Sequence, residues 1–284
     1  MTFRRIAFTV VTLAVAILSL AAARQRPAPV KTLRLYVFEN GSIKGLDPKL
    51  FNFTREELKE VDFTNTSYLI VHPKGTLMFD AGAVEDSHFK GDGAPVTEGI
   101  MTATKPLLPQ LAAAGYKPSD ITFFAMSHYH SDHTANANAF AGATWIVQKA
   151  ERDFMFGDKP QGIIQPAQYS ALKTAKTKVL NNEDLDVFGD RTVVVKSAPG
   201  HTPGHQVLFV KLPKMGPVLL AGDLYHYPEE RTTGRVPTFE FNVDQSKASR
   251  AKIELFIKEQ QALLWIEHDI ATHAKLPKAP AFVE

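Results

Sequence analysis

Short apolar runs separated by polar, glycine-containing turns recur along this chain, and they predict a protein rich in β-strands. The runs with β-branched and aromatic residues that we expect to form strands are 33–38, 67–71, 76–80, 121–126, 144–148, 192–196, 206–210, 218–221 and 263–266. Helices are expected at 105–114 and at 245–262, the second with Asp244 as its N-cap. Because no linker or composition shift divides these segments, the pattern indicates one α/β domain.

The first 23 residues differ from the rest of the chain. Arg4 and Arg5 precede an apolar run over 6–23 that ends in small residues, and a polar stretch follows. This order is typical of a secretory signal. We therefore expect a cleaved signal over 1–23, a spacer over 24–32 and a folded domain over 33–284. An uncleaved anchor is the alternative, because the run is just long enough to span a bilayer. Either way we expect export by a bacterium, to the periplasm or beyond.

The composition of the chain limits the classes of protein to which it can belong. Of the 284 residues 44% are hydrophobic and 22% are charged, which is typical of a chain with a packed core. The formal net charge is only +2 and no Lys/Arg run stands out, so we expect no nucleic-acid partner. The absence of cysteine excludes disulfides and thiol nucleophiles. Any metal site must therefore use histidine and carboxylate ligands.

The strongest chemical signal is a cluster formed by His128, His130, Asp132 and His133, directly after the apolar run 121–126. In extended backbone, alternate side chains point the same way, so His128 and His130 can reach one point. Asp132 and His133 follow on a turn and can reach a second point nearby. Three imidazoles and a carboxylate suit Zn²⁺. Because the chain has only ten histidines, we interpret the cluster as metal ligands rather than as a solvated loop.

Three further candidate ligands each follow a predicted strand. His201 stands in a loop of Gly and Pro residues after 192–196, Asp223 follows 218–221, and His268 follows 263–266. The Gly and Pro residues preset a tight turn that would hold His201 rigidly. His205 opens the next strand, and we expect it to have a supporting or structural role. The shared position at strand ends predicts that these side chains meet.

Together these residues resemble the signature of the metallo-β-lactamase superfamily, over about residues 33–270. The HxHxDH motif stands at 128–133, with the later ligand positions at 201, 223 and 268. The resemblance implies an α/β fold, an αββα sandwich of two mixed β-sheets flanked by helices. It also implies two divalent metal ions, with Zn²⁺ expected. One ion would be held by His128, His130 and His201, the other by Asp132, His133 and His268, and both by Asp223.

Within the superfamily the chain is most similar to the N-acyl-homoserine lactonases. The stretches that carry this similarity are LRLYVFENGSI, DFTNTSYLIVHPKGTLMFDAG, SHYHSDH, SAPGHTPGHQVLFV, LLAGDLYHY and LLWIEHD. One position departs from the pattern. Those lactonases place a tyrosine three residues after the bridging aspartate, where it contacts the substrate carbonyl. Here that residue is His226, between Tyr225 and Tyr227. His226 or a neighbouring tyrosine is expected to take the role, with aromatic packing as the alternative for each.

The resemblance implies a hydrolase that opens the lactone ring of an acyl lactone. A metal-bridging hydroxide would attack the carbonyl. Asp132 would pass a proton to the leaving group, and His226 or Tyr225 would stabilise the oxyanion. An acyl chain needs an apolar groove. The phenylalanines that could line it, with core packing as the alternative, are Phe51, Phe53, Phe63, Phe239 and Phe241.

Two other readings compete with the lactonase. The first is a related exported hydrolase of phosphotriesters, other esters or thioesters on the same scaffold. The second is a binding protein with a structural metal, but a structural zinc site uses four ligands and this chain offers seven candidates. The expected partners are a small-molecule substrate and, in a homodimer, a second copy of the chain.

Overall fold

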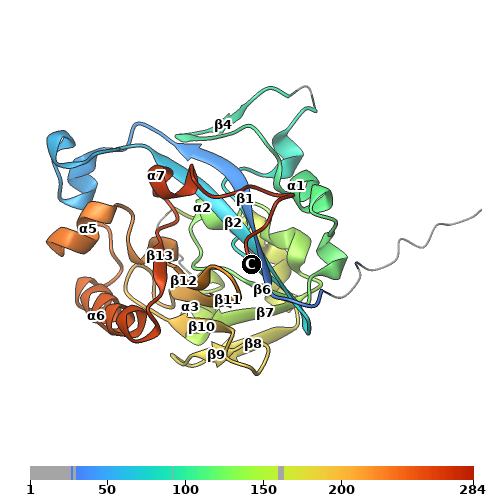
Figure 1. The fold of residues 1–284 in the computed structure, drawn as a ribbon. Coiled ribbons are helices and arrows are strands. Elements are labelled where there is room, and N and C mark those ends of the chain that lie inside the picture. Colours follow the sequence, from blue (N-terminus) through green and yellow to red (C-terminus); the bar gives the residue numbers. More distant parts are fainter. Residues whose placement is uncertain (1–26, 28–29, 92, 159–162) are drawn as a thin grey trace, which may run out of the picture.

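The computed structural model describes residues 27, 30–91, 93–158 and 163–284, and two β-sheets form its centre (Figure 1). The predicted signal at 1–23 lies outside the described residues, as does most of the predicted spacer at 24–32. Among the described residues, no helix has the length and apolar character that crossing a bilayer requires.

The larger sheet is mixed and has eight strands in the order β4-β5-β1-β2-β3-β6-β7-β8. Its strands are β1 (Arg34–Ile43), β2 (Phe63–His72), β3 (Gly75–Phe79), β4 (Val96–Glu98), β5 (Met101–Ala103), β6 (Phe123–Ala125), β7 (Thr144–Gln148) and β8 (Thr177–Leu180). Pairing is antiparallel from β4 to β3 and parallel from β3 to β8. The parallel half brings the carboxyl ends of its strands to one edge of the sheet.

The smaller sheet has five strands in the order β13-β12-β11-β10-β9. They are β9 (Leu185–Asp186), β10 (Val193–Ser197), β11 (Gln206–Leu212), β12 (Gly216–Leu220) and β13 (Leu263–Trp265). β12 and β13 pair in parallel, and the other pairs are antiparallel. Because β10, β12 and β13 point the same way, their carboxyl ends also meet at one edge.

Helices cover the outer faces of both sheets (Figure 1). The α-helices are α1 (Leu107–Ala113), α2 (Ser131–Thr134), α3 (Lys149–Met155), α4 (Pro166–Tyr169), α5 (Pro228–Thr233), α6 (Val243–Gln260) and α7 (Ile270–His273). The 3₁₀ helices are η1 (Pro48–Phe51), η2 (Arg55–Glu57), η3 (Asp86–His88), η4 (Pro118–Asp120), η5 (Ala137–Phe140), η6 (Ser170–Thr174) and η7 (Gly222–Leu224).

Successive side chains of a strand point to opposite faces of its sheet, and β1 shows how this produces the layers. Leu35 and Val37 pack between the two sheets, against residues of β10, β11 and β12. Tyr36 and Phe38 face the other way and pack with residues of α1, α3 and α4. On the far side, α6 packs Ile253 onto the smaller sheet. The layers are therefore helix, sheet, sheet, helix, which confirms the predicted sandwich.

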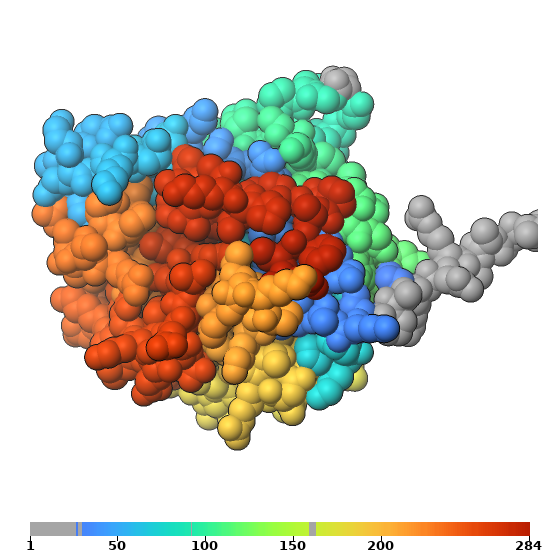
Figure 2. All heavy atoms as spheres, viewed as in Figure 1, coloured from blue at the N-terminus to red at the C-terminus, as the bar shows by residue number. Residues whose placement is uncertain are grey.

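The ends of the domain lie side by side. Leu35 of β1 forms a β-bridge with Val283 near the carboxyl terminus. Figure 2 shows the same arrangement, with red carboxyl-terminal residues beside blue residues of β1. The last residues therefore close the edge of the domain next to its first strand.

Each predicted strand overlaps a strand of the structure, but one predicted cap is wrong. Helix α6 begins at Val243, and its N-cap is Asn242, whose side chain accepts a hydrogen bond from the Gln245 N–H. Asp244, predicted as the cap, lies in the first turn of the helix. There its carboxylate still interacts favourably with the helix dipole. Both residue types cap helices well, so the local sequence did not separate them.

Candidate metal centre

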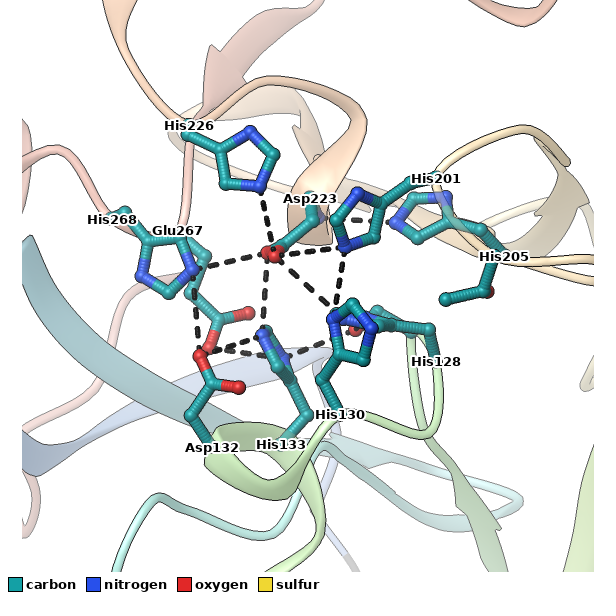
Figure 3. A network of polar contacts seen from close by, with 12 residues as sticks. His128, His130, Asp132, His133, His201, His205, Asp223, His226, Glu267 and His268 are labelled. Atoms are coloured by element: carbon teal, nitrogen blue, oxygen red, sulfur yellow. Dashed lines mark hydrogen bonds and ion pairs between the residues drawn. The ribbon is translucent and has the colours of Figure 1, made fainter. Parts of the chain in front are cut away.

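The candidate ligands lie just after the carboxyl ends of four strands. His128, His130, Asp132 and His133 follow β6, His201 follows β10, Asp223 lies in η7 after β12, and His268 follows β13. Figure 3 shows these side chains pointing toward one another from both sheets. The tertiary structure thus gathers all seven predicted ligands in one place.

The seven residues form two groups of converging ligand atoms. One contains His128, His130, His201 and Asp223, and the other contains Asp132, His133 and His268. Within each group the candidate ligand atoms lie within 4.8 Å of one another. Two neighbouring groups of this kind can hold two metal ions.

Asp223 lies between the two groups. Its Oδ2 atom is 3.3 Å from His201 Nε2 and 3.6 Å from His128 Nε2. Its Oδ1 atom is 3.2 Å from His133 Nε2 and 3.1 Å from His268 Nε2. Each carboxylate oxygen therefore faces one group, as a carboxylate shared by two ions requires.

The unpaired atoms of the site fit metal ions. His128 Nε2, His133 Nε2 and Asp223 Oδ1 are buried and have no hydrogen-bond partner. Burying polar atoms without a partner is costly, and nearly all such atoms in proteins are satisfied. Imidazole and carboxylate donors suit Zn²⁺ and related divalent ions. The residues present therefore fit metal ions.

Electrostatics favours the metal-binding form of histidine at two of the candidate ligands, while neighbouring carboxylates raise the pKa of His133 and His201. Burial lowers the pKa of His130 to about 3 and holds the pKa of His128 well below its ordinary value, and neighbouring imidazoles act in the same direction. Burial opposes ionisation of Asp132, yet the adjacent His133 keeps the pKa of this carboxyl below its ordinary value. Neutral imidazole and ionised carboxylate are the forms that coordinate metal.

His205 supports Asp223 from outside the cluster, as expected of a supporting residue. Its Nδ1–H donates to the Ala198 carbonyl at 3.1 Å, and its Nε2 accepts from the Asp223 N–H at 3.1 Å. Burial lowers the pKa of His205 to about 3, so the ring is neutral and keeps one tautomer. The ring thereby fixes the backbone from which the Asp223 carboxylate extends.

Sequence reasoning missed the carboxylates behind His133. Its Nδ1 atom faces Asp80 Oδ2 at 3.3 Å and Glu267 Oε1 at 3.4 Å, and all three side chains are buried. Carboxylates behind a ligating histidine orient the ring and raise its basicity. Asp80 does carry a sequence signal, because it closes the predicted strand 76–80 just as Asp223 follows another. For Glu267 the sequence signal is only its position next to His268.

Glu151 joins the two histidine loops and was also missed. This buried carboxylate accepts from the Tyr129 N–H at 2.8 Å, from the Gly204 N–H at 2.8 Å and from the Thr202 hydroxyl. Tyr129 lies between His128 and His130, while Thr202 and Gly204 follow His201. Burial raises the pKa of Glu151 to about 7, against these hydrogen bonds.

Replacing Glu151 with alanine should destabilise the protein by about 3 kcal/mol or more, because three buried donors would lose their acceptor. For a chain of this size that corresponds to a fall in Tm of about 6–12 °C. Thermal unfolding followed by circular dichroism measures the change. Glu259→Ala, on the exposed face of α6, is the control and should stay within about 0.5 kcal/mol of the unaltered protein. Equal Tm values for the two variants would contradict this role.

The side chains of Tyr225, His226 and Tyr227 point in different directions. His226 Nε2 lies 3.2 Å from Asp223 Oδ2, inside the cluster of candidate ligands. The Tyr225 hydroxyl instead donates to Glu254 at 3.1 Å, and the Tyr227 hydroxyl donates to the Val61 carbonyl at 2.8 Å. His226 is therefore the member of this trio that the structure turns toward the metal groups.

An apolar cavity of about 330 Å³ opens onto the ligands. Its walls are Ile43, Leu46, Leu50, Phe51, Phe63, Ile100, Met101, Ile163 and Phe239, and its floor is His130, Asp132, Asp223, His226 and His268. Of the predicted phenylalanines, Phe51, Phe63 and Phe239 line this cavity. Phe53 packs against Tyr227 and Phe241 lies against Phe154, both away from it. The cavity thus joins an apolar wall to a polar floor.

Comparison with known proteins identifies relatives of this chain. An N-acyl homoserine lactonase from Rhizobium radiobacter is 28% identical over 88% of this chain and 98% of its own length. A Bacillus N-acyl homoserine lactonase is 28% identical over 84% of this chain and 94% of its own length. Among solved structures, a quorum-quenching N-acyl homoserine lactone lactonase superposes with a TM-score of 0.74 at 23% identity, covering 90% of this chain and 100% of that one.

The last comparison agrees with the fold already described. The sequence model of the metallo-beta-lactamase superfamily matches residues 61–259, a segment that includes six of the seven candidate ligands. His268 lies just beyond the matched segment. The match and the two mixed sheets flanked by helices confirm the resemblance, and the chain belongs to the metallo-beta-lactamase superfamily.

Proposed function

We propose that this protein is a metal-dependent hydrolase that opens the lactone ring of N-acyl homoserine lactones, with two divalent ions, expected to be Zn²⁺. One observation carries the proposal, namely the apolar cavity whose floor is the ligand cluster. An N-acyl homoserine lactone has the same two parts, an apolar chain and a polar ring with an ester carbonyl. The curated relatives, which carry this activity in their names, support the same substrate class.

In this proposal His128, His130 and His201 hold one ion, Asp132, His133 and His268 hold the other, and Asp223 is shared. When bound, such ions would lower the pKa of a coordinated water to about 7 and would polarise the carbonyl oxygen of the substrate. The apolar walls exclude bulk water, which strengthens every electrostatic interaction at the floor.

The chain itself supplies proton transfer and orientation. Asp132 lines the cavity, and its Oδ2 lies 3.4 Å from His133 Nε2 and 3.7 Å from His268 Nε2. From this place Asp132 can carry a proton to the ring oxygen as the lactone opens. His226 lines the same cavity and can donate to the carbonyl oxygen as it gains charge.

Replacing His226 with phenylalanine should lower kcat about 100-fold, the effect of removing one donor to a developing oxyanion. Phenylalanine keeps the ring packing against Phe51 and Phe63. Zinc content should not change, because His226 belongs to neither ligand group. His226→Tyr, which restores a donor, should recover part of the activity. Steady-state kinetics with zinc analysis tests this, and full activity of His226→Phe would refute the role.

A substrate panel tests the proposed function. The zinc-loaded protein is assayed with N-acyl homoserine lactones of increasing chain length, an aryl phosphotriester, a thioester and a β-lactam, each also after chelation. We expect the highest kcat/KM for the lactones, a rise with chain length as the apolar wall is covered, and loss of activity on chelation. A higher kcat/KM for the phosphotriester or the thioester would replace this proposal with the related hydrolase.

Export belongs to the same proposal. The basic start, apolar run and small residues of 1–23 support a cleaved secretory signal and a mature protein in the periplasm or outside the cell. Mass spectrometry of the protein recovered from cell fractions gives the mature amino terminus and its place. A cytoplasmic protein that keeps its first residues would overturn this part alone.

A further inference from the structure

The outer nitrogen of His201 has a dedicated partner. His201 Nε2 faces the cluster, 3.3 Å from Asp223 Oδ2 and 3.1 Å from His130 Nδ1. On the other side of the ring, Nδ1 lies 3.2 Å from Glu240 Oε1. A carboxylate only accepts, so Glu240 favours the tautomer with the hydrogen on Nδ1, in which Nε2 keeps the lone pair that a metal needs.

Glu240 is itself held firmly. Its side chain is 1% exposed, and its second oxygen accepts from the Ser246 hydroxyl in the first turns of α6. The backbone directly after it is held against the His201 loop, because the Phe241 N–H donates to the His201 carbonyl at 3.2 Å and the Asn242 N–H donates to the Gly200 carbonyl at 2.9 Å. Glu240 therefore cannot turn away from His201 without breaking this segment.

The close contact between the His201 loop and α6 explains Gly200. Its φ of +141° is a conformation that L side chains rarely adopt, and an added Cβ would lie 2.2 Å from the Ser246 backbone nitrogen. The loop and the helix therefore meet backbone to backbone. This contact places Ser246 where it braces Glu240.

We propose that Glu240 is the positioning residue for His201, and that it sets the affinity of one of the two metal ions. His201 belongs only to the group with His128, His130 and Asp223. The other group has different support, since His133 Nδ1 faces Asp80 and Glu267 while His268 Nδ1 donates to the Thr64 carbonyl at 2.9 Å. Loss of Glu240 should therefore weaken the binding of one ion and leave the binding of the other unchanged.

The same segment reaches the substrate cavity. Phe239, directly before Glu240, lines the cavity and packs against Phe51 with ring centroids 5.3 Å apart. One short stretch of chain thus forms part of the apolar wall and holds a metal ligand. The inference rests on the metal centre of the proposed function and not on the lactone substrate.

Zinc binding by the full chain tests the inference. Glu240→Leu removes the acceptor, while Glu240→Gln keeps a neutral acceptor at Oε1, and Glu259→Gln on the exposed face of α6 is the control. Zinc affinities come from competition with a chromophoric chelator, and zinc content comes from mass spectrometry of the intact protein. We expect one of two ions to bind about 10–100-fold more weakly in Glu240→Leu. The second ion should be unchanged, and Glu240→Gln should fall in between.

The outcomes are distinguishable. Two ions of unaltered affinity in Glu240→Leu, or equal weakening of both, would overturn the role of Glu240 and leave the proposed function standing. An unaltered chain that binds no zinc would overturn both. If Glu240→Leu does not fold, Ser246→Ala removes only the hydroxyl that donates to Glu240 and should weaken the binding of the same ion several-fold. Unchanged zinc affinities in Ser246→Ala and Glu240→Gln would then refute the inference.

Discussion

Replacing Asp223 with alanine should lower kcat/KM for an N-acyl homoserine lactone at least about 1,000-fold, a loss of about 4 kcal/mol of transition-state stabilisation. The reason is that the two oxygens of Asp223 face the two ligand groups, at 3.1–3.6 Å from four imidazole nitrogens. Its loss removes a ligand from each ion. Zinc content should therefore fall along with activity.

Steady-state kinetics and zinc analysis of the same samples measure both effects. Asp153→Ala, which removes an exposed carboxylate on α3, is the matched control and should keep full activity and full zinc content. Circular dichroism shows whether each variant folds. A folded Asp223→Ala protein that keeps two zinc ions and most of its activity would contradict the shared-ligand assignment.

Removing both metal ions should lower the Tm by about 16–32 °C. Ligand present at 1,000 times its Kd stabilises the folded state by about 4 kcal/mol per site. For a chain of this size each kcal/mol corresponds to about 2–4 °C. The structural reason is the burial of His128 Nε2, His133 Nε2 and Asp223 Oδ1 without other partners. These atoms pack favourably only when an ion satisfies them.

Differential scanning calorimetry with and without a chelator measures this shift, and added zinc should reverse it. The Asp223→Ala variant provides the control, since a chelator should move its Tm far less than that of the unaltered protein. A chelator that strips all zinc from the unaltered protein without lowering its Tm would show that the cluster does not depend on metal for stability.

The candidate ligands could be predicted from the sequence because each of them follows an apolar run. Asp223 and His268, 45 positions apart, each come directly after a strand of the smaller sheet, and β12 and β13 pair in parallel. Parallel strands end at the same edge, so residues that follow them must lie close together. The length of each strand and the cap of α6 were less certain, since neighbouring residues with equal local preference compete there.

The surroundings of the metal centre had no comparable signal. Glu240 and Glu151 stand in segments without periodic pattern. Glu240 meets His201, 39 positions away, and Glu151 meets Tyr129 and Thr202, 22 and 51 positions away. His226 and Tyr225 are adjacent, and either could donate a hydrogen bond to the substrate. Only the direction of the chain after η7 turns His226 toward Asp223 and Tyr225 toward Glu254. The apolar wall likewise combines Ile43, Ile100 and Phe239 from three distant segments.

The order of apolar and polar residues was thus enough to indicate one α/β domain and to identify candidate metal ligands, because strand ends and ligand chemistry are local properties. Which of the candidate phenylalanines line the cavity, and which carboxylates orient those ligands, was decided only by the tertiary structure. Such choices depend on which loops meet in space, and contacts between loops depend on the packing of both sheets at once.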